Sequence, residues 1–568
     1  MASYDSAPWL AHYTPWTNAT LDYGDATLVS AYADNLAKHR DDPATCFFGR
    51  RLTYGELDAE VRRTAASLAA SGVAAGDRVA IMLPNCPQHL VAFYAVALLG
   101  AVAVEHNPLY TAAELTPQFN DHGAKIALVW DKAAATATEL RGTTPLETVV
   151  SVDITKAMPR LARLGLRLPL KKLREARAQL TAPAPETISY EAFVSEALRG
   201  DAAEAFTPAR VAPDDPLAIL YTSGTTGQPK GAIITHRTLC ANALQGVAWV
   251  EDFQRSSQRM LGTLPLFHAF GLVFTTALPL FTGSEVILLP APQIPLVLGA
   301  IKKYKPTFVP GVPTLFERVV EQAQERGVDI SSLNIGFSGA ASLPGPLIDD
   351  FERLTGGRLI EGYGLTEAGP ILIGNPQSDE RRPGYIGLPF PDTDVRIANP
   401  DNPEETVPFG EAGEILARGP QIFPGYFNND EATAKAFHNG WFRTGDMGVM
   451  DEEGFVKIVS RIKELIITGG FNVYPAEVED VIRQHPDVTD AAVVGRPRSD
   501  GSEDVVACVT LRQGAALDPE GLRAHAKKNL TPYKVPRTFY HFEQLARDPL
   551  GKIRRREVRD DLLKKLEG

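Results

Sequence analysis

Short runs of β-branched and apolar residues alternate with amphipathic helical patterns along most of the 568 residues. One unit is well marked, because Thr53 and Glu56 have capping-box spacing and apolar residues then recur on one helical face as far as Leu68. A buried strand over 78–83 follows this helix. Such alternation is typical of helices layered on sheets, so we predict an α/β fold.

The most distinct boundary in the chain lies near residues 459–464, just after a turn signal at 451–454. We predict a compact series beyond it: strand 465–468, a Gly469-Gly470 turn, helix 476–484, strands 490–495 and 505–511, and helix 519–529. The chain would then consist of a large N-terminal domain of layered sheets and helices over 1–459, a hinge over 460–464 and a small mobile α+β domain over 465–568.

The overall charge is acidic, with a formal net charge of −12. A general nucleic-acid-binding protein would need a basic field, so that class is excluded. The four cysteines lie far apart and show neither disulfide-framework nor metal-ligand spacing, at Cys46, Cys86, Cys240 and Cys508. The N-terminus lacks the basic start and apolar run of a signal peptide. These features favour a cytoplasmic protein.

Two apolar stretches could be mistaken for membrane spans. Residues 90–104 are too few to cross a bilayer, and residues 264–284 contain Pro265, Gly271 and Pro279, which a lipid-facing helix tolerates poorly. We predict that both stretches are buried core, with the second also lining a site for an apolar ligand.

Residues 156–177 differ in charge from the rest of the chain. They carry eight basic residues and one acid, with leucines between them. This pattern is typical of a helix that lies on anionic lipid, which would place the protein at the inner face of the membrane. It is also typical of a solvated surface helix, and Pro159 and Pro169 favour that alternative because they shorten any continuous amphipathic face.

The strongest local signal is a loop of hydroxyls and glycines that follows an apolar run over 217–221. Glycines let backbone N–H groups approach an anion, hydroxyls donate hydrogen bonds, and Lys230 adds positive charge. The loop therefore predicts a site for the β- and γ-phosphates of a nucleotide, although it lacks Walker A spacing. The candidate residues are Thr222, Ser223, Gly224, Thr225, Thr226, Gly227 and Lys230.

Further motifs follow this loop in a fixed order. They are Pro265-Leu-Phe-His-Ala-Phe-Gly-Leu272, Gly339-Ala-Ala-Ser-Leu343, Glu361-Gly-Tyr-Gly-Leu-Thr-Glu367, Trp441-Phe-Arg-Thr-Gly-Asp446, Arg461-Ile-Lys-Glu464 and Gly551-Lys552. Together they resemble the motifs of adenylate-forming enzymes, which comprise acyl-CoA synthetases, peptide-synthetase adenylation domains and beetle luciferases. Asn107-Pro-Leu-Tyr-Thr111 and Gly470-Phe-Asn-Val-Tyr-Pro475 are most similar to bacterial long-chain fatty-acid–CoA ligases.

The resemblance implies an ATP site with Mg²⁺. Glu367 matches the carboxylate that binds Mg²⁺, Thr366 the hydroxyl at the α-phosphate, and Tyr363 the aromatic ring against adenine. Asp446 and Arg461 match ribose contacts, and Lys552 matches the lysine that bridges the carboxylate and the α-phosphate. The nucleotide site would also include Gly339, Ala340, Ala341, Gly362 and Gly364. Catalytic roles would fall to Lys230, Thr366, Glu367 and Lys552.

The implied reaction has two steps. A fatty acid and ATP give acyl-adenylate and pyrophosphate, and CoA then gives acyl-CoA and AMP. Between the steps the small domain would turn about Lys463. The acyl group would lie against Phe267, His268, Gly339 and Gly364, and the CoA channel against Gly469, Gly470 and Phe471. The resemblance also implies a homodimer.

Other functions stay open on the sequence. The acid could have a medium chain or an aryl group, and a luciferase-like oxygenase shares the fold. A fatty acyl-AMP ligase would pass the adenylate to a carrier protein, but those relatives carry an insertion near the hinge that is absent between Arg461 and Glu464. A non-catalytic membrane-surface fatty-acid-binding protein would not need the intact set Lys230, Glu367, Asp446, Arg461 and Lys552.

Overall fold

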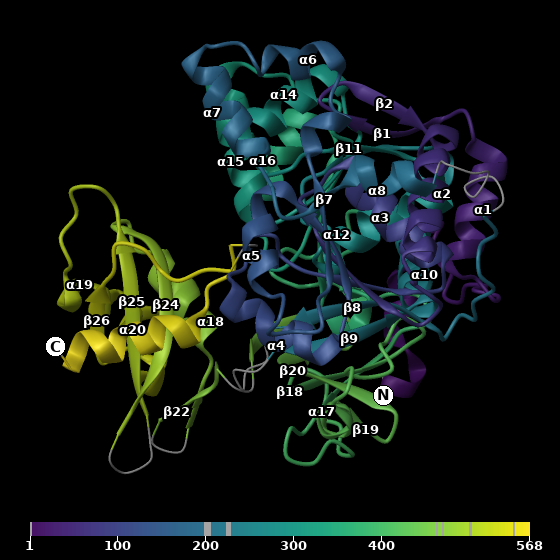
Figure 1. The fold of residues 1–568 in the computed structure, drawn as a ribbon. Helices are drawn as coiled ribbons and strands as arrows, with labels where there is room; N and C mark the ends of the chain where they lie inside the picture. The colour runs from purple at the N-terminus through teal and green to yellow at the C-terminus, as the bar shows by residue number, and fades with distance from the viewer. Residues whose placement is uncertain are drawn as a thin grey trace.

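The computed structural model describes residues 3–197, 206–222, 229–461, 464–468, 471–498, 503–548 and 551–567. Figure 1 shows a large N-terminal part, coloured purple to green, and a smaller C-terminal part in yellow-green and yellow. Helices cover sheets in both parts. The predicted α/β class, with a large N-terminal and a small C-terminal domain, is therefore confirmed.

The first sheet of the large domain has seven strands, in the order β7-β6-β5-β3-β4-β8-β9. All neighbouring strands are parallel except β9, which runs antiparallel to β8. The carboxyl ends of the parallel strands therefore meet at one edge of the sheet. The bounds are β3 (Arg78–Met82), β4 (Val102–Glu105), β5 (Ile126–Trp130), β6 (Thr148–Val152), β7 (Ile188–Ser189), β8 (Pro216–Thr222) and β9 (Lys230–Thr235).

The second sheet has nine strands, in the order β16-β15-β14-β13-β12-β10-β11-β1-β2, and is parallel from β14 to β1. Its bounds are β1 (Pro43–Phe47), β2 (Arg50–Thr53), β10 (Arg259–Gly262), β11 (Glu285–Leu288), β12 (Phe308–Gly311), β13 (Ile335–Ser338), β14 (Arg358–Gly364), β15 (Ile371–Gly374) and β16 (Leu388–Pro389). A third sheet, mainly antiparallel, contains β17 (Asp394–Ala398), β18 (Ala412–Arg418), β19 (Phe437–His438), β20 (Trp441–Met450) and β21 (Val456–Arg461).

Helices pack on both parallel sheets, as expected when parallel strands are joined by crossover helices. The capping box predicted at Thr53 is confirmed, because Glu56 N–H donates to Thr53 Oγ1 at 3.1 Å and Thr53 N–H donates to Glu56 Oε2 at 2.9 Å. The principal helices are α1 (Leu28–His39), α2 (Tyr54–Ala70), α3 (Pro87–Leu98), α4 (Ala112–His122), α5 (Ala134–Glu139), α6 (Arg160–Gly165), α7 (Lys171–Leu180), α8 (Tyr190–Ala197), α10 (His236–Trp249), α11 (Glu251–Arg255), α14 (Ile294–Tyr304), α15 (Pro313–Arg326), α16 (Gly345–Thr355) and α17 (Asp430–Ala436).

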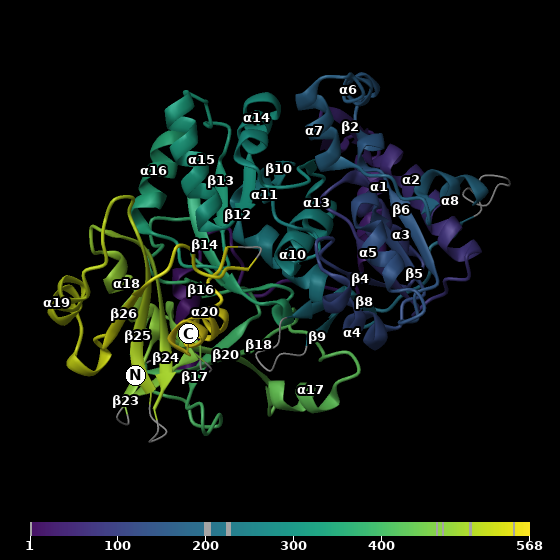
Figure 2. The ribbon, with the colours of Figure 1, turned by 60° about the vertical axis from the view of Figure 1, so that its left-hand side comes forward.

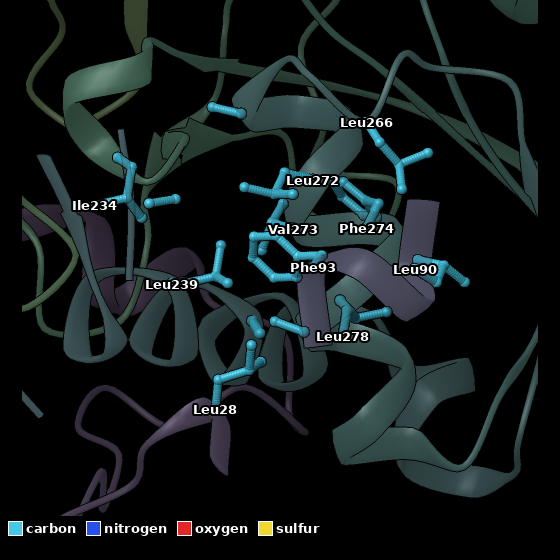
Figure 3. Close-up of a cluster of buried hydrophobic side chains, with 14 of the residues drawn as sticks. Leu28, Leu90, Phe93, Ile234, Leu239, Leu266, Leu272, Val273, Phe274 and Leu278 are labelled. Atoms are coloured by element: carbon cyan, nitrogen blue, oxygen red, sulfur yellow. The ribbon is translucent and has the colours of Figure 1, made fainter. Parts of the chain in front are cut away.

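The main hydrophobic core contains side chains from both parallel sheets and from the helices between them. The apolar stretch 264–284 folds into three short pieces here, α12 (Ala269–Leu272), the π-helical turn η5 (Val273–Ala277) and α13 (Leu278–Thr282). Figure 3 shows Phe93, Leu239 and Leu272 converging in this cluster. Both apolar stretches are therefore core, as predicted. Within the described residues, no helix combines the length and apolar character that a bilayer crossing requires.

A buried polar pair lies inside this core, where α3 meets β4. His89 Nε2 is 2.9 Å from Glu105 Oε2, and neither side chain is exposed. His89 Nδ1 lies 3.3 Å from the Pro84 carbonyl oxygen, which can only accept, so Nδ1 carries a proton. All four cysteines are also buried, as free thiols.

The C-terminal domain contains the predicted elements in their predicted order, together with two strands, Phe471–Val473 and Thr538–His541, and one helix, Arg555–Glu567, that the sequence did not predict. Its three-stranded sheet, β24-β25-β26, is covered by helices, and a separate hairpin is formed by β22 and β23. The bounds are β22 (Ile466–Thr468), β23 (Phe471–Val473), α18 (Pro475–Arg483), β24 (Val488–Pro497), β25 (Glu503–Leu511), α19 (Pro519–Asn529), β26 (Thr538–His541) and α20 (Arg555–Glu567). The strands β24 and β25 are longer than predicted, because charged residues pair across their outer ends, as Arg496 and Asp504 do at 2.9 Å.

Candidate active site

A cleft of about 880 Å³ lies at the carboxyl ends of parallel strands from both large sheets. Residues at or just beyond the ends of β4, β8, β13 and β14 line it. This is the usual place for a ligand in an α/β fold, because the strand ends leave a crevice that loops can equip. The predicted residues that line it are Thr222, Lys230, Phe267, His268, Gly339, Ala340, Gly362, Tyr363, Gly364, Thr366, Glu367, Asp446 and Lys552.

The two ends of the predicted phosphate loop are held together at the cleft. Thr222 and Lys230 are register partners at the ends of β8 and β9, and Thr222 Oγ1 donates to the Lys230 carbonyl oxygen at 3.4 Å. Lys230 Nζ lies 5.0 Å from the ring centroid of Tyr426, within range of a cation–π contact. The strand pairing thus places an ammonium group beside the start of the loop.

A sharp turn positions Thr366 and Glu367. A Cβ on Gly364 would lie 1.8 Å from the Pro370 carbonyl oxygen, so only glycine fits there. Leu365 N–H donates to that same oxygen at 2.9 Å and closes the turn. The glycine of this motif is therefore required by backbone packing, and the turn it permits directs two polar side chains into the cleft.

The Glu367 carboxylate is held by a tyrosine from a distant part of the chain. Tyr426 Oη donates to Glu367 Oε1 at 2.8 Å. Burial and the nearby carboxylate of Glu367 raise the pKa of Tyr426 well above its ordinary value, so the phenol stays a donor at neutral pH. Sequence reasoning missed Tyr426, because only the approach of the 419–427 segment to the Glu367 turn makes it part of the site.

The lining of the cleft also includes Tyr363 and Asp446. Tyr363 Oη donates to Asp446 Oδ2 at 2.6 Å, and both residues are buried. Ala340 has a φ of 69°, an unusual left-handed conformation for a residue with a side chain, and it also lines the cleft. Arg461 is the register partner of Asp446 between β21 and β20. A planar base and its ribose bound here would therefore contact the ring of Tyr363, the carboxylate of Asp446 and the left-handed backbone at Ala340.

Glu414 supports the turn that carries Asp446, and sequence reasoning missed it as well. Its Oε1 accepts from Gly445 N–H at 3.1 Å, and its Oε2 accepts from Arg443 Nε at 2.9 Å. Gly445 has a φ of 72°, which suits glycine. An isolated glutamate in a strand gives no sequence signal for such a role, because the role depends on β18 and β20 lying side by side.

The C-terminal domain contributes its own residues to the cleft. Asp548, Lys552 and Arg554 all line it. Lys552 N–H donates to Asp548 Oδ1 at 2.9 Å, which fixes the turn that carries the lysine. Burial lowers the pKa of His268, and the Asp548 carboxylate raises it by a smaller amount. His268 is therefore a neutral imidazole at pH 7. Because His268 belongs to the large domain and Asp548 to the C-terminal domain, the two domains meet at this part of the cleft.

Some predicted residues are not placed in the cleft. Ala341 is exposed and is not among the lining residues. Phe471 belongs to β23, and neither its side chain nor that of Arg461 lies within the described part of the structure. The predicted residues outside the described ranges are Ser223, Gly224, Thr225, Thr226, Gly227, Lys463, Gly469 and Gly470.

Beside the site, β14 buries a carboxyl group that has an unusual titration. Burial raises the pKa of Glu361 to about 8, and its Oε2 has no hydrogen-bond partner among the described residues. The folded state therefore keeps a proton that the unfolded chain loses near its ordinary pKa of 4.5. The stability that this proton supplies is complete below pH 4.5 and is lost as the pH rises toward 8.

We therefore expect Glu361→Gln to flatten the decline in stability between pH 5 and pH 8, because glutamine cannot lose a proton. Melting temperatures of the wild type and the variant across this range would measure the effect. Glu452→Gln, at an exposed position, is the matched control. If the melting temperatures of the wild type and of Glu361→Gln changed in parallel between pH 5 and pH 8, Glu361 would be ionised in the folded protein throughout this range.

Two family models match this chain. The AMP-binding enzyme model matches residues 32–427, and the AMP-binding enzyme C-terminal domain model matches residues 477–552. Among curated relatives, a long-chain-fatty-acid–CoA ligase of Bacillus subtilis (strain 168) is 36% identical over 555 residues, which is 98% of each chain. One from Escherichia coli O157:H7 is 34% identical over 95% of each chain. A feruloyl-CoA synthase of Amycolatopsis sp is 35% identical over 90% of this chain and 94% of its own.

Solved structures agree with these matches. ATP-bound MatB from Rhodopseudomonas palustris is 29% identical, with a TM-score of 0.81 over 95% of this chain and 99% of its own. O-succinylbenzoate coenzyme A synthetase from Bacillus subtilis, in complex with ATP and a magnesium ion, is 26% identical, with a TM-score of 0.73 over 93% of this chain and 99% of its own. Because the match runs through both domains and nearly the whole length, this chain belongs to the AMP-binding enzyme family.

Proposed function

We propose that this protein is an ATP-dependent long-chain fatty-acid–CoA ligase, an acid–thiol ligase that uses ATP and CoA as substrates. The observation that carries the proposal is a cleft in which Lys552 of the C-terminal domain meets Lys230, Glu367 and Asp446 of the large domain. The curated ligases at 34–36% identity over nearly the full chain support the choice of substrate.

In the first half-reaction, a carboxylate oxygen of the fatty acid attacks the α-phosphorus of ATP. The new O–P bond replaces the bond to pyrophosphate, which leaves, so the protein need not supply a nucleophile. Its residues instead orient the reactants and neutralise charge. We assign adenine to Tyr363 and Ala340, and the ribose to Asp446 and Arg461. The phosphates are assigned to Lys230, Thr366 and the loop 222–227. The reacting carboxylate is assigned to Lys552 and His268.

Mg²⁺ is part of the proposal. Among the described residues, no cluster of three or more His, Cys, Asp or Glu side chains could hold a metal ion unaided. The cleft does contain the Glu367 carboxylate, and a hard ion that keeps waters and binds substrate phosphates needs only one or two such ligands. Glu367 therefore fits Mg²⁺ held jointly with ATP, and the ion would supply positive charge at the phosphates.

The second half-reaction needs a different face of the small domain. We place the N-terminal domain at 1–459, the hinge at 460–464 with Lys463 as pivot, and the mobile domain at 465–568. After the turn, Gly469, Gly470 and Phe471 would line the channel for CoA. The CoA thiolate then attacks the acyl carbon of the mixed anhydride, and AMP leaves. A homodimer and a peripheral membrane contact belong to the same proposal.

An aryl acid is the second candidate substrate class, since the feruloyl-CoA synthase is nearly as similar as the fatty-acid ligases. The acyl site that we propose, next to Phe267 and His268, opens beside the aromatic rings of Phe270 and Phe337, which would contact a chain or a ring equally well. Each buried methylene is worth about 0.8 kcal/mol, whereas a ring gains from stacking. Chain-length dependence therefore separates the two classes.

The test is AMP release with MgATP and CoA across straight-chain acids from acetate to oleate, with ferulate as the aryl acid. We expect kcat/KM to rise with each added methylene, by up to about fourfold per carbon at 0.8 kcal/mol, until the chain fills its site. A maximum at ferulate would select the aryl alternative. Pyrophosphate release without CoA-dependent AMP release would select a fatty acyl-AMP ligase, and inactivity with every acid would overturn the ligase assignment.

A further inference from the structure

Two short helices form an exposed hairpin on the large domain, which we define as residues 159–180. It contains α6 and α7, and α6 lies at the upper edge of the molecule in both views (Figures 1 and 2). Neither helix contributes a buried residue. The hairpin thus presents most of its surface outward.

Leucines are concentrated on the outer surface of this hairpin. Four of the nine large apolar side chains that are exposed in the described residues lie within ten consecutive positions. They are Leu161, Leu164, Leu168 and Leu170, with exposed fractions of 84%, 55%, 52% and 58%. Single exposed leucines are ordinary, but a contiguous group of this size is typical of an interaction site.

The charge of the hairpin is opposite to that of the whole chain. It carries seven basic residues and one acid, Glu175, so its net charge is 7 − 1 = +6 on a protein of −12. Among the described residues, Lys171 pairs with Glu175 at 4.0 Å, and no ion pair involves the other six basic side chains. The basic residues are Arg160, Arg163, Arg167, Lys171, Lys172, Arg174 and Arg177. Lys156, just outside the hairpin, is instead paired with Glu191.

The C-terminal end of the hairpin is fixed to the first sheet. Trp130 Nε1 donates to the Leu180 carbonyl oxygen at 2.9 Å, and Lys132 Nζ donates to the Gln179 carbonyl oxygen at 3.2 Å. Thr181 Oγ1 also donates to the Asp131 carboxylate. These bonds hold the C-terminal end of α7 against the end of β5, so the hairpin is anchored to the large domain at this end.

We infer that the hairpin 159–180 is a docking surface for an anionic bilayer. The leucines would enter the boundary between headgroups and acyl chains, while the arginines and lysines contact lipid phosphates. A nucleic acid would match the charge but would leave the four leucines without an apolar partner. The bilayer is therefore the partner that satisfies both halves of the surface. This inference rests on the proposed function and deepens its peripheral membrane contact by naming the surface and the lipid. Vesicle binding is measured without substrate, so its failure is distinguishable from a failure of the ligase assignment.

The test is sedimentation of the full chain with vesicles of phosphatidylcholine alone or of phosphatidylcholine mixed with anionic phosphatidylglycerol. We expect binding only to the anionic vesicles, and weaker binding at high salt because exposed charges are screened. Each basic residue contributes about fivefold to partitioning, so R160Q/R163Q/R167Q should lower it by about 100-fold. L161S/L164S/L168S should lower it by at least about tenfold.

The control variants change comparable residues on other surfaces. R326Q/K527Q/K528Q removes three exposed basic groups and L109S removes an exposed leucine, and both should bind anionic vesicles as the wild type does. Far-UV circular dichroism and melting temperatures confirm that every variant is folded. Equal binding by wild type and hairpin variants, or equal binding to neutral and anionic vesicles, would overturn the inference. Binding to an RNA duplex but not to vesicles would assign the surface to nucleic acid instead.

Discussion

Lys552→Ala is expected to slow acyl-adenylate formation by about 10²–10³-fold and to leave thioester formation from supplied acyl-adenylate close to the wild-type rate. The magnitude is that of removing one preorganised group that stabilises charge developing in the transition state. Lys552 is well suited to that role, because its turn is fixed by Asp548 and its side chain lines the cleft. Pyrophosphate release with ATP and fatty acid measures the first half-reaction, and acyl-CoA formation from synthetic acyl-adenylate measures the second.

Lys564→Ala is the matched control, since it removes an exposed lysine from the following helix, α20. It should change neither half-reaction. The separation of the two rates is the informative result, because a domain that presents one face for adenylation and another for thioester formation uses Lys552 in the first step only. An equal loss in both half-reactions would contradict the two-face mechanism.

His89→Ala is expected to destabilise the large domain by about 3–5 kcal/mol, because it leaves the buried Glu105 carboxyl group without its partner. With an unfolding entropy of about 2.1 cal/mol/K per residue, a domain of about 450 residues should melt about 3–5 °C lower. Differential scanning fluorimetry measures this shift. The reason is that both side chains are buried, so removing one of them leaves a buried polar group without its hydrogen-bond partner.

Two further variants test the cause. His39→Ala removes a partly exposed histidine that is 2.8 Å from Asp42, and it should lower the melting temperature little, because such pairs contribute only up to about 1 kcal/mol. The double variant H89L/E105L replaces the whole pair by apolar groups and should recover much of the loss. If the double variant melts no higher than His89→Ala, the pair contributes net stability to the fold and does more than offset the cost of burying its two members.

Local signals in the sequence predicted local structure well. The capping box at Thr53 and the bounds of α19 depend on residues three to eleven positions apart, and the structure confirms both. The helix α20 was missed, because its mean composition is strongly polar and only Val558 and Leu562 mark a buried face. An amphipathic stripe of two residues is too narrow to stand out in a sequence.

The candidate site shows a different limit. Motif order predicted Tyr363, Glu367, Asp446 and Lys552, which three separate segments bring to one cleft. The residues that hold them could not be predicted, since Tyr426 reaches Glu367 from 59 positions away. Such contacts depend on how sheets and loops meet in three dimensions, and no spacing in the chain encodes them.

The burial of every cysteine has a practical consequence for kinetics. Burial raises the pKa of Cys86, Cys240 and Cys508 to about 12, and it also raises the pKa of Cys46. A disulfide reagent reacts with exposed thiolates, which none of these side chains supplies in the folded enzyme. Free coenzyme thiol in a reaction mixture can therefore be titrated with such a reagent without a background from the protein, so each turnover is counted directly as lost thiol.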